Sequence, residues 1–401
     1  MIRYGAVLIV LFISIFPVAA QEHPDDLSLG EQLQPVSPEN LFRTPGYYNW
    51  GSSIIRGKDG TYHLFYARWK KAYRFTGWMV LSEVAHAVSK SPAGPWKYKE
   101  TVLQGRGAGH WDAYTVHNPK IKYFDGKYYL YYTSTNLGAQ ELSQEQLEEV
   151  ARTGYSHPLW WPLRNNQRAG VAVAPSPDGP WQRADHPLIE PSGPITTLTV
   201  NPAVTQGPDG KYYLIVKGDK PREKRFIRNQ AVAVGESPAG PFVMQPQPVI
   251  DYLDTEDMSM WYDSTRKRFY GVFHARGFIG MVTSPDGIHW RKATEYVLMP
   301  KVVPLAGNDT LRPDRLERPF IYTEDGEVKV LSLAAKKGDN SFCVFIPVKE
   351  NKNPLPDAVQ PAWQKAETGV VFHYDLHVFD GKGDIVRDFV NSRLYGTQET
   401  P

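Results

Sequence analysis

Short runs of alternating apolar and polar residues, each ending at a tight-turn signal, recur along most of the chain. In the clearest example, residues 109–135, a polar and aromatic start leads into a strand-like run at 119–123. An Asp125-Gly126 pair and a tyrosine-rich run at 127–133 follow. An Asp-Gly pair between two such runs is typical of a β-hairpin. The pattern therefore predicts a unit made of a polar start, a strand, a tight turn and a second strand.

This unit occurs five times along the chain. Its hairpins begin at Asp59, Asp125, Asp209, Asp263 and Asp325. In four of the units a Ser-Pro turn follows a strand of small residues, at Ser91, Ser176, Ser237 and Ser284. Repeats of this length, each supplying three or four strands, favour radial blades over a parallel solenoid. The sequence therefore predicts an all-β protein, a five-bladed β-propeller spanning residues 41–350.

One long segment, residues 137–167, interrupts the second unit. Its Ser143-Gln144-Glu145-Gln146 pattern is a capping box and predicts a short helix that continues to Arg152. Because the segment also carries Trp160-Trp161-Pro162, we expect this helical insertion in blade two to be a lid or rim loop over one face. Residues 351–401 contain one more strand-like run, and this C-terminal extension either closes the ring or packs beside it.

The first 20 residues have the pattern of a secretory signal. A basic start is followed by an apolar run from Ala6 to Phe16 and by small residues at 18–20. Residues 21–40 are polar and proline-containing, typical of an N-terminal arm. We therefore expect the mature protein to be periplasmic or secreted, without a membrane attachment after signal cleavage.

Composition narrows the class of protein further. The 401 residues include 45 basic and 43 acidic side chains, a formal net charge of +2, so there is no electrostatic footprint for nucleic acid. Cys343 is the single cysteine, which excludes an internal disulfide and a cysteine metal cluster. We expect no cofactor and no metal, and the sequence leaves the oligomeric state open.

In a propeller, the residues just before the innermost strand of each blade converge on a central funnel. The residues at these strand starts are Asn49-Trp50-Gly51 in blade one, His117-Asn118 in blade two, Asn201 in blade three, Glu256-Asp257 in blade four and Glu317-Arg318 in blade five. A single Asn or Asp at such a place means little. Charged or His-Asn pairs at matched places in three blades predict a shared site.

Acidic groups that converge from separate blades suit the cleavage of a glycosidic bond. One carboxylic acid protonates the leaving oxygen, and one carboxylate activates water or attacks the sugar. We interpret Asp112 as the base, Glu317 as the acid and Asp257 as a modulator of their pKa values. Neighbouring residues of a strand point to opposite faces, so Glu256 takes the role of modulator if Asp257 points away from the funnel. The simpler alternative is that these carboxylates form ion pairs with basic residues around the rim.

Aromatic and basic residues near the funnel indicate the kind of ligand. Trp50 and Trp111 are candidates for stacking on a sugar ring, although ordinary blade packing is the alternative. If Lys217 and Arg318 face the funnel, an anionic sugar such as a uronate or a sulfated unit fits the site. We interpret His117 as a hydrogen-bonding residue rather than a metal ligand, because it has no other histidine at ligand spacing.

Several motifs give the chain a resemblance to a known group of enzymes. They are the strand starts Asn118-Pro119 and Asn201-Pro202, the Asp-Gly-Lys-Tyr-Tyr-Leu hairpins and the Ser-Pro-x-Gly-Pro-Trp turns. Over residues 41–350 the chain resembles the five-bladed propeller glycoside hydrolases of families 43, 62, 32 and 117. The resemblance implies three catalytic acids from different blades. Where family 43 has Asp-Pro in blade one, this chain has Trp50-Gly51-Ser52, so Asp112 is the nearest replacement and the chain is similar to the exo-acting family 117.

The sequence thus favours a secreted glycoside hydrolase that acts on oligosaccharides or polysaccharide fragments from plants or algae. Two alternatives remain at this point. A glycoside phosphorylase would use one acid and a basic phosphate cradle, which Lys217, Arg318 and His117 could supply. A carbohydrate-binding propeller without catalysis would use the same funnel.

Overall fold

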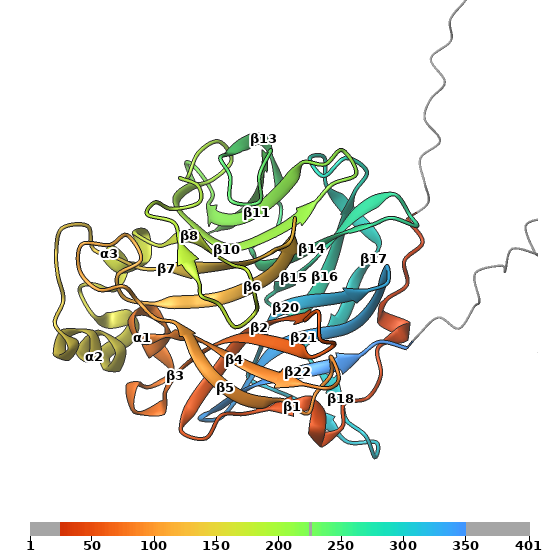
Figure 1. Ribbon diagram of the computed structural model, residues 1–401, viewed down its shortest axis with the longest axis horizontal. Helices are drawn as coiled ribbons and strands as arrows, with labels where there is room; N and C mark the ends of the chain where they lie inside the picture. The colour runs from red at the N-terminus through yellow and green to blue at the C-terminus, as the bar shows by residue number, and fades with distance from the viewer. Residues whose placement is uncertain (1–24, 224–226, 350–401) are drawn as a thin grey trace, which may run out of the picture. The chain divides into compact units, whose positions relative to one another are not determined.

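A computed structural model describes residues 25–223 and 227–349, and these residues form five four-stranded antiparallel sheets arranged as blades (Figure 1). The first strand of each blade packs against the first strand of the next blade around the whole ring. The prediction of an all-β, five-bladed propeller is therefore confirmed. The predicted signal at 1–20 and the C-terminal extension at 351–401 lie outside the described residues.

The blades follow the chain in order. Blade one contains β2 Tyr47–Arg56, β3 Tyr62–Lys70, β4 Glu83–Ser89 and β5 Lys97–Leu103. Blade two contains β6 Val116–Phe124, β7 Lys127–Ser134, β8 Arg168–Ala174 and β9 Gln182–Arg183. Blade three contains β10 Thr196–Gln206, β11 Tyr212–Asp219, β12 Arg228–Gly235 and β13 Phe242–Ile250. Blade four contains β14 Thr255–Asp263, β15 Arg268–Ala275, β16 Phe278–Ser284 and β17 Arg291–Pro300.

Blade five joins the two ends of the described chain. Its strands are β20 Arg315–Glu324, β21 Glu327–Lys337, β22 Asn340–Pro347 and, from the N-terminal side, β1 Leu41–Phe42. Leu41 pairs with Val344 and Phe42 with Cys343, so the fourth strand of this blade comes from the other end of the propeller. Such pairing closes the ring with hydrogen bonds between segments far apart in sequence, which removes the open edge of the sheet.

Each innermost strand is interrupted by the same backbone feature near its start. The register with the second strand shifts there in all five blades. At each shift one residue has a positive φ between 39° and 62°: Gly51, Asn118, Asn201, Asp257 and Arg318. Residues in this left-handed conformation bend the strand and redirect the side chain, as in a β-bulge. The fold therefore turns five equivalent side-chain positions toward the axis.

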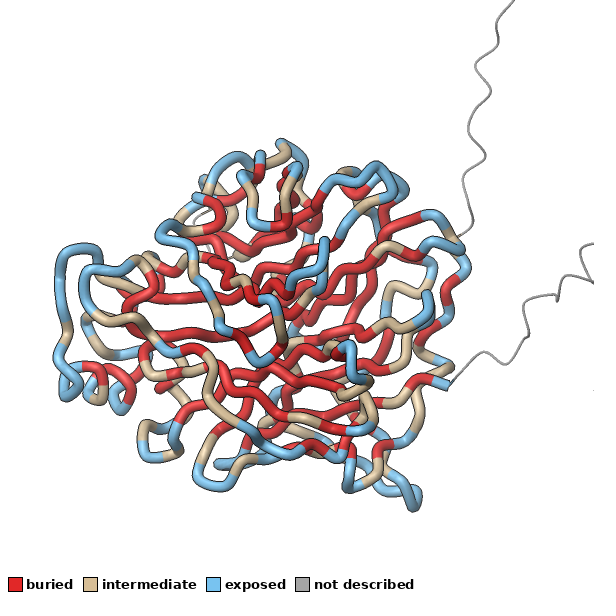
Figure 2. Tube along the Cα trace, in the orientation of Figure 1, coloured by how far each residue is buried: buried red, intermediate tan, exposed pale blue. Residues whose placement is uncertain are grey.

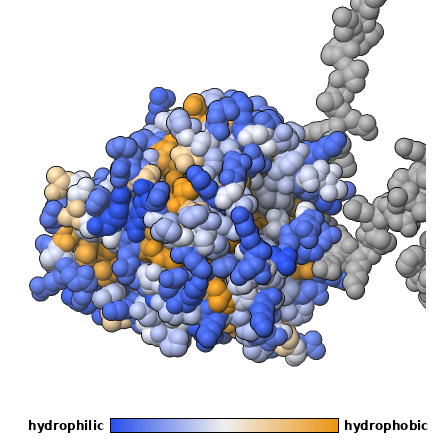
Figure 3. All heavy atoms as spheres, viewed as in Figure 1, coloured by the Kyte–Doolittle hydropathy of each residue, from blue (hydrophilic) through white to orange (hydrophobic). Residues whose placement is uncertain are grey.

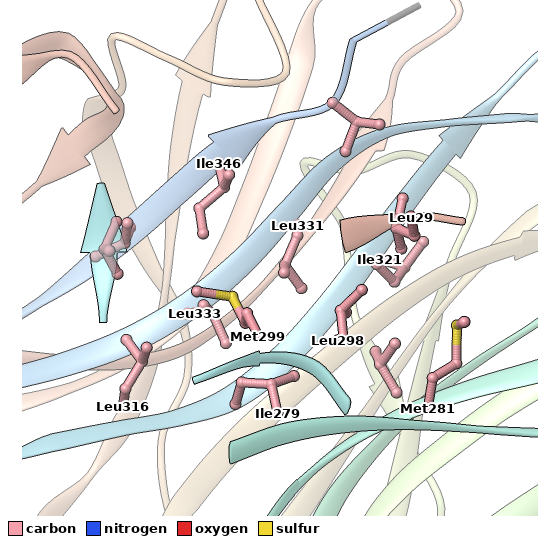
Figure 4. Close-up of a cluster of buried hydrophobic side chains, with 14 of the residues drawn as sticks. Leu29, Ile279, Met281, Leu298, Met299, Leu316, Ile321, Leu331, Leu333 and Ile346 are labelled. Carbon is pink, nitrogen blue, oxygen red and sulfur yellow. The ribbon is translucent and has the colours of Figure 1, made fainter. Parts of the chain in front are cut away.

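Hydrophobic clusters fill the spaces between neighbouring blades, one at each of the five junctions in the described part of the chain. Figure 2 shows the buried residues along the strands and the exposed ones mainly in the connecting loops. Between blades four and five, for example, Ile279 and Met281 pack with Leu331, Leu333 and the N-terminal residue Leu29 (Figure 4). Removal of this apolar area from water is what holds the blades side by side.

The helices gather at one edge of the blades (Figure 1). They are α1 Trp78–Leu81, α2 Gln144–Thr153 and α3 Trp160–Asn165, with the 3₁₀ turns η3 Lys71–Tyr73, η4 Phe75–Gly77 and η5 Gly154–Ser156 beside them. Two further 3₁₀ turns, η1 Gly30–Gln32 and η2 Pro38–Asn40, lie against β17 and β22. The capping box at Ser143 and Gln146 starts α2. The strands β18 Val303–Pro304 and β19 Thr310–Leu311 form a small separate hairpin.

One face of the described part is mainly polar. Figure 3 shows a largely hydrophilic face with small hydrophobic patches. In that part of the chain, no helix combines the length and the apolar character that a membrane crossing requires.

Candidate active site

A pocket of about 730 Å³ lies at the starts of the innermost strands. This volume is in the range of pockets that bind small ligands. Its aromatic lining consists of Trp50, Trp69, Phe75, Trp78, Tyr155, Trp160 and Trp161. The last three belong to the insertion 137–167, which therefore supplies part of the pocket wall.

Positive charge exceeds negative charge in this lining. The basic residues are Arg164, Lys217, Arg228, Arg276, Lys301, Arg315 and Arg318, and the acidic residues are Asp254, Glu256, Asp314 and Glu317. Several of these side chains neutralise each other. Arg276 and Lys301, however, have no ion-pair partner within 4 Å among residues 25–223 and 227–349, so their charges remain available to a ligand.

The left-handed residues connect their side chains in a line across the bottom of the pocket. Asn118 Nδ2 donates to Asn201 Oδ1 at 2.7 Å, and Asn201 Nδ2 donates to Asp257 Oδ1 at 2.5 Å. Arg318 forms an ion pair with the same carboxylate. A small second cavity lies among Gly51, Asn118, Asn201, Asp257 and Arg318. The bulges of four blades therefore build one continuous polar network, in which Gly51 leaves room for the side chain of Asn118.

Asp257 of blade four and Glu317 of blade five lie close together, and His274 from the second strand of blade four lies beside them. One ligand-type atom of each residue lies within 4.8 Å of the others, which makes this one of two places in the described chain that could hold a metal ion. His274 Nδ1 is 2.7 Å from Asp257 Oδ2, but neither atom has a partner in hydrogen-bonding geometry. Burial lowers the pKa of His274 to about 3, so the imidazole is neutral at physiological pH.

Glu256 lines the pocket beside two basic residues. Its carboxylate is 2.7 Å from Lys217 Nζ and also pairs with Arg228. Burial, followed by the nearby Arg228, lowers the pKa of Lys217 well below its usual value. Burial works to raise the pKa of Asp254, but the bidentate Arg228 guanidinium outweighs it and holds this pKa below its usual range. Glu256 thus lies beside two basic side chains in the pocket wall.

His117 lies in the pocket wall between aromatic rings. Its Nδ1 is 2.9 Å from Ser82 Oγ, and its ring contacts Trp69 and Trp78. Burial, together with the charge of Arg318, lowers the pKa of His117 well below the usual value. The side chain is therefore a neutral hydrogen-bonding group.

Three residues that the sequence placed in the funnel lie outside the pocket lining. Asp112 is fully buried in blade two, where its carboxylate is 2.5 Å from Arg106 Nε and 3.2 Å from Arg183 Nη1. Trp111 donates to the Ala184 carbonyl, and Asn49 donates to Thr44 Oγ1. Of the three predicted catalytic acids, the structure therefore brings together Asp257 and Glu317 and not Asp112, whose ion pairs hold it away from the pocket.

The other predicted residues border the pocket or the small cavity beneath it: Trp50, His117, Asn118, Asn201, Lys217, Glu256 and Arg318. Sequence reasoning missed His274, Arg228 and Lys301. His274 could have been found from strand pairing. It lies directly opposite Glu256 on the second strand of blade four, and the predicted residue Lys217 has the corresponding place opposite Val200 in blade three.

Known proteins that resemble this chain share its fold. The family model described as "Glycosyl hydrolases family 43" matches residues 96–237, which run from the end of blade one through most of blade three. No curated protein sequence matches the chain significantly.

The solved structures point the same way. Zg3597, a family 117 glycoside hydrolase from the marine bacterium Zobellia galactanivorans, is 18% identical, with a TM-score of 0.54 over 78% of this chain and 89% of that one. BT0996, solved as an RGII complex, is 12% identical, with a TM-score of 0.55 over 80% and 94%. The resemblance to propeller glycoside hydrolases is therefore confirmed by a family 43 match over part of the chain and by the shared fold.

Proposed function

We propose that the chain is a glycoside hydrolase that binds the end of an anionic oligosaccharide in the 730 Å³ pocket. The observation that carries this proposal is the meeting of carboxylates from blades four and five in a pocket walled by tryptophans. Support also comes from the family 43 match and from the glycoside hydrolases among the structural relatives.

In the proposed reaction, Glu317 is the acid that protonates the oxygen of the leaving sugar. Glu256 takes the role first assigned to Asp112, as the carboxylate that activates water or attacks the anomeric carbon. The basic side chains of Lys217 and Arg228 contact the Glu256 carboxylate and hold it in place in the pocket. Asp257 acts as the modulator, because it lies buried between the network of Asn201 and Arg318 on one side and Glu317 on the other.

The charge of the pocket supports an anionic substrate. A carboxylate or sulfate on the sugar would be bound by Arg276 and Lys301, whose charges have no ion-pair partner among the described residues. Charge-assisted hydrogen bonds of this kind are about twice as strong as neutral ones. The insertion supports action at a chain end, because Tyr155 and Trp160 wall one side of the pocket.

The experiment is a screen of aryl glycosides and of plant and algal oligosaccharides, neutral and acidic. On a substrate that the parent cleaves, Glu317→Gln and Glu256→Gln should each lower kcat by about 10²–10⁴-fold, the usual contribution of a general acid or base. Glu236→Gln is the control, since its carboxylate is exposed and belongs to a turn of blade three outside the pocket. Near-parental rates in both pocket variants would contradict the assignment.

The anionic preference has its own test. Arg276→Gln and Lys301→Gln should raise KM for a uronate-containing or sulfated substrate, while KM for a matched neutral substrate stays the same. An equal change for both substrates would mean that these residues shape the pocket and do not recognise the charge.

The same basic residues also suit inorganic phosphate, which keeps a glycoside phosphorylase as the second candidate. The two reactions differ in their product. Each active substrate should therefore be incubated with and without phosphate, and a sugar phosphate as the main product would replace hydrolysis with phosphorolysis. We further propose that the protein is exported, from the signal pattern at residues 1–20.

A further inference from the structure

A second cluster of metal-ligand side chains lies far from the pocket, at the junction of blades one and two. The pocket is at the starts of the innermost strands, whereas His63 pairs with Ile55 near the opposite end of β2. His86 comes from the neighbouring strand β4, and Asp178 comes from the Ser-Pro turn of blade two. One ligand-type atom from each of the three residues lies within 4.8 Å of the others.

The contacts of His86 are unusual for a fully buried side chain. One ring nitrogen, Nε2, is 2.9 Å from His63 Nδ1 and shares a hydrogen bond with it. The other nitrogen, Nδ1, is buried and has no hydrogen-bond partner. Buried polar atoms without a partner are rare, because each costs about 1–3 kcal/mol. A missing partner at this position is therefore a structural signal.

The surroundings of this nitrogen indicate what the partner would be. Asp178 Oδ1 and Glu100 Oε1 each lie 3.6 Å from His86 Nδ1, which is too far for a hydrogen bond. Two ligands of one tetrahedral zinc ion, each at about 2.0–2.2 Å from it, are about 3.4 Å apart. The spacing of His86 Nδ1 and Asp178 Oδ1 is thus close to that of two ligands on one ion.

We propose that His86 Nδ1 and Asp178 bind a divalent transition-metal ion of the zinc type, with His63 as the outer partner that holds the His86 ring, so that the ion joins the turn of blade two to blade one. Imidazole nitrogen and carboxylate oxygen are ligands that such ions prefer. The hydrogen bond between the two histidines fixes the ring of His86, in the way that outer partners orient the ligands of known metal sites.

One contact competes with the ion. Lys99 Nζ is 2.6 Å from Asp178 Oδ1, so the ammonium now neutralises the carboxylate that the ion would use. Both side chains are more than a third exposed, at 40% and 49%, so the lysine can move aside into water. If Lys99 and the ion compete for Asp178, removing the lysine charge should strengthen metal binding. A cluster with a purely structural role would show no such effect.

The test is calorimetric titration of the untagged full chain with zinc chloride after removal of bound metals by a chelator. Cobalt(II) absorption in the visible range then reports the geometry at the ion. We expect one zinc site at this cluster, at least about tenfold weaker in Asp178→Asn, because even outer partners of metal sites are worth about 10–100-fold. In Lys99→Met the Kd should decrease. Glu236→Gln removes an exposed carboxylate that pairs with Lys211 and belongs to neither candidate metal cluster of the described residues, and should leave the Kd unchanged.

Melting curves without metal keep the outcome interpretable, because the exposed Asp178 and Lys99 side chains should be replaceable without loss of the fold. Zinc binding that is unaffected by both variants would place the ion elsewhere, for example at Asp257, His274 and Glu317, and would overturn the proposal. Absence of zinc binding to the parent chain would overturn it as well.

Discussion

Replacing Asn201 by glycine and by alanine tests the polar network beneath the pocket. Asn201 has a φ of 55°, accepts a hydrogen bond from Asn118 and donates one to Asp257. Alanine removes both hydrogen bonds and keeps a Cβ, which strains the left-handed backbone, and it has no polar side chain to compensate. Glycine removes the same two hydrogen bonds but adopts this backbone conformation freely.

The magnitude follows from these two parts. The lost bond to the charged Asp257 costs about 1.5–3 kcal/mol, and the buried Asn118 amide left without its acceptor costs about 1–3 kcal/mol. Both variants should therefore lose roughly 3–5 kcal/mol of unfolding free energy. Alanine should lose about 1 kcal/mol more than glycine, because the cost of the left-handed conformation exceeds the entropy that glycine adds to the unfolded chain.

Urea unfolding at pH 7.5, followed by tryptophan fluorescence, measures both effects if the m-values agree. The control is Asn229, a buried residue within strand β12 whose φ is not positive. There the order should reverse, with glycine less stable than alanine by about 0.5–1 kcal/mol. An alanine variant of Asn201 as stable as the glycine variant would refute the backbone argument, and two variants as stable as the parent would refute the network.

Three further outcomes are expected. The pKa of His117 is well below 6.5 in the folded chain, so the unfolded chain takes up a proton that the folded chain does not, and stability falls as the pH falls below about 6.5. His117→Gln should remove this contribution. Below about pH 5.5, the free energy of urea unfolding of the variant should therefore fall less steeply with pH than that of the parent, by up to about 1.4 kcal/mol per pH unit. Trp161→Ala should raise KM about two- to tenfold on an active oligosaccharide by loss of stacking, with the melting temperature kept, because the ring is half exposed. Asp112→Asn should lower the unfolding free energy by about 3–5 kcal/mol, since Arg106 and Arg183 lose a buried carboxylate, while kcat of the folded enzyme stays near the parent value.

The fold could be predicted because its signals are local. An Asp-Gly hairpin needs only the few residues on either side of it, and these recur in register with the blades. The closing strand Leu41–Phe42 could not be found this way, since its partner β22 lies some 300 residues further along the chain and two residues carry no periodic pattern. Ring closure depends on a long-range pairing that local propensity does not encode.

The site could be predicted where it depends on the same repeat. Asn118, Asn201 and Asp257 stand at strand starts whose equivalence is visible in the sequence, and the bulges turn them inward. Asp112 has no such place, because it lies in the connection before β6, and its side chain is directed by Arg106 and Arg183. A carboxylate near a funnel residue in sequence is therefore weaker evidence than one at an equivalent position of the repeat.

The residue types at the five positive-φ positions show which of them the backbone conformation alone explains. Glycine, asparagine and aspartate tolerate positive φ, so Gly51, Asn118, Asn201 and Asp257 satisfy the fold without further explanation. Arginine does not belong to this group, yet Arg318 has a φ of 59° and lies partly buried at the pocket floor, where desolvation lowers its pKa to about 9. An unfavourable backbone and a desolvated charge at one residue are kept where the surrounding structure needs the group. Arg318 pairs with the carboxylate of Asp257, which lies close to Glu317, so the fifth position of the ring brings a charged group to the pocket floor as well as bending the strand.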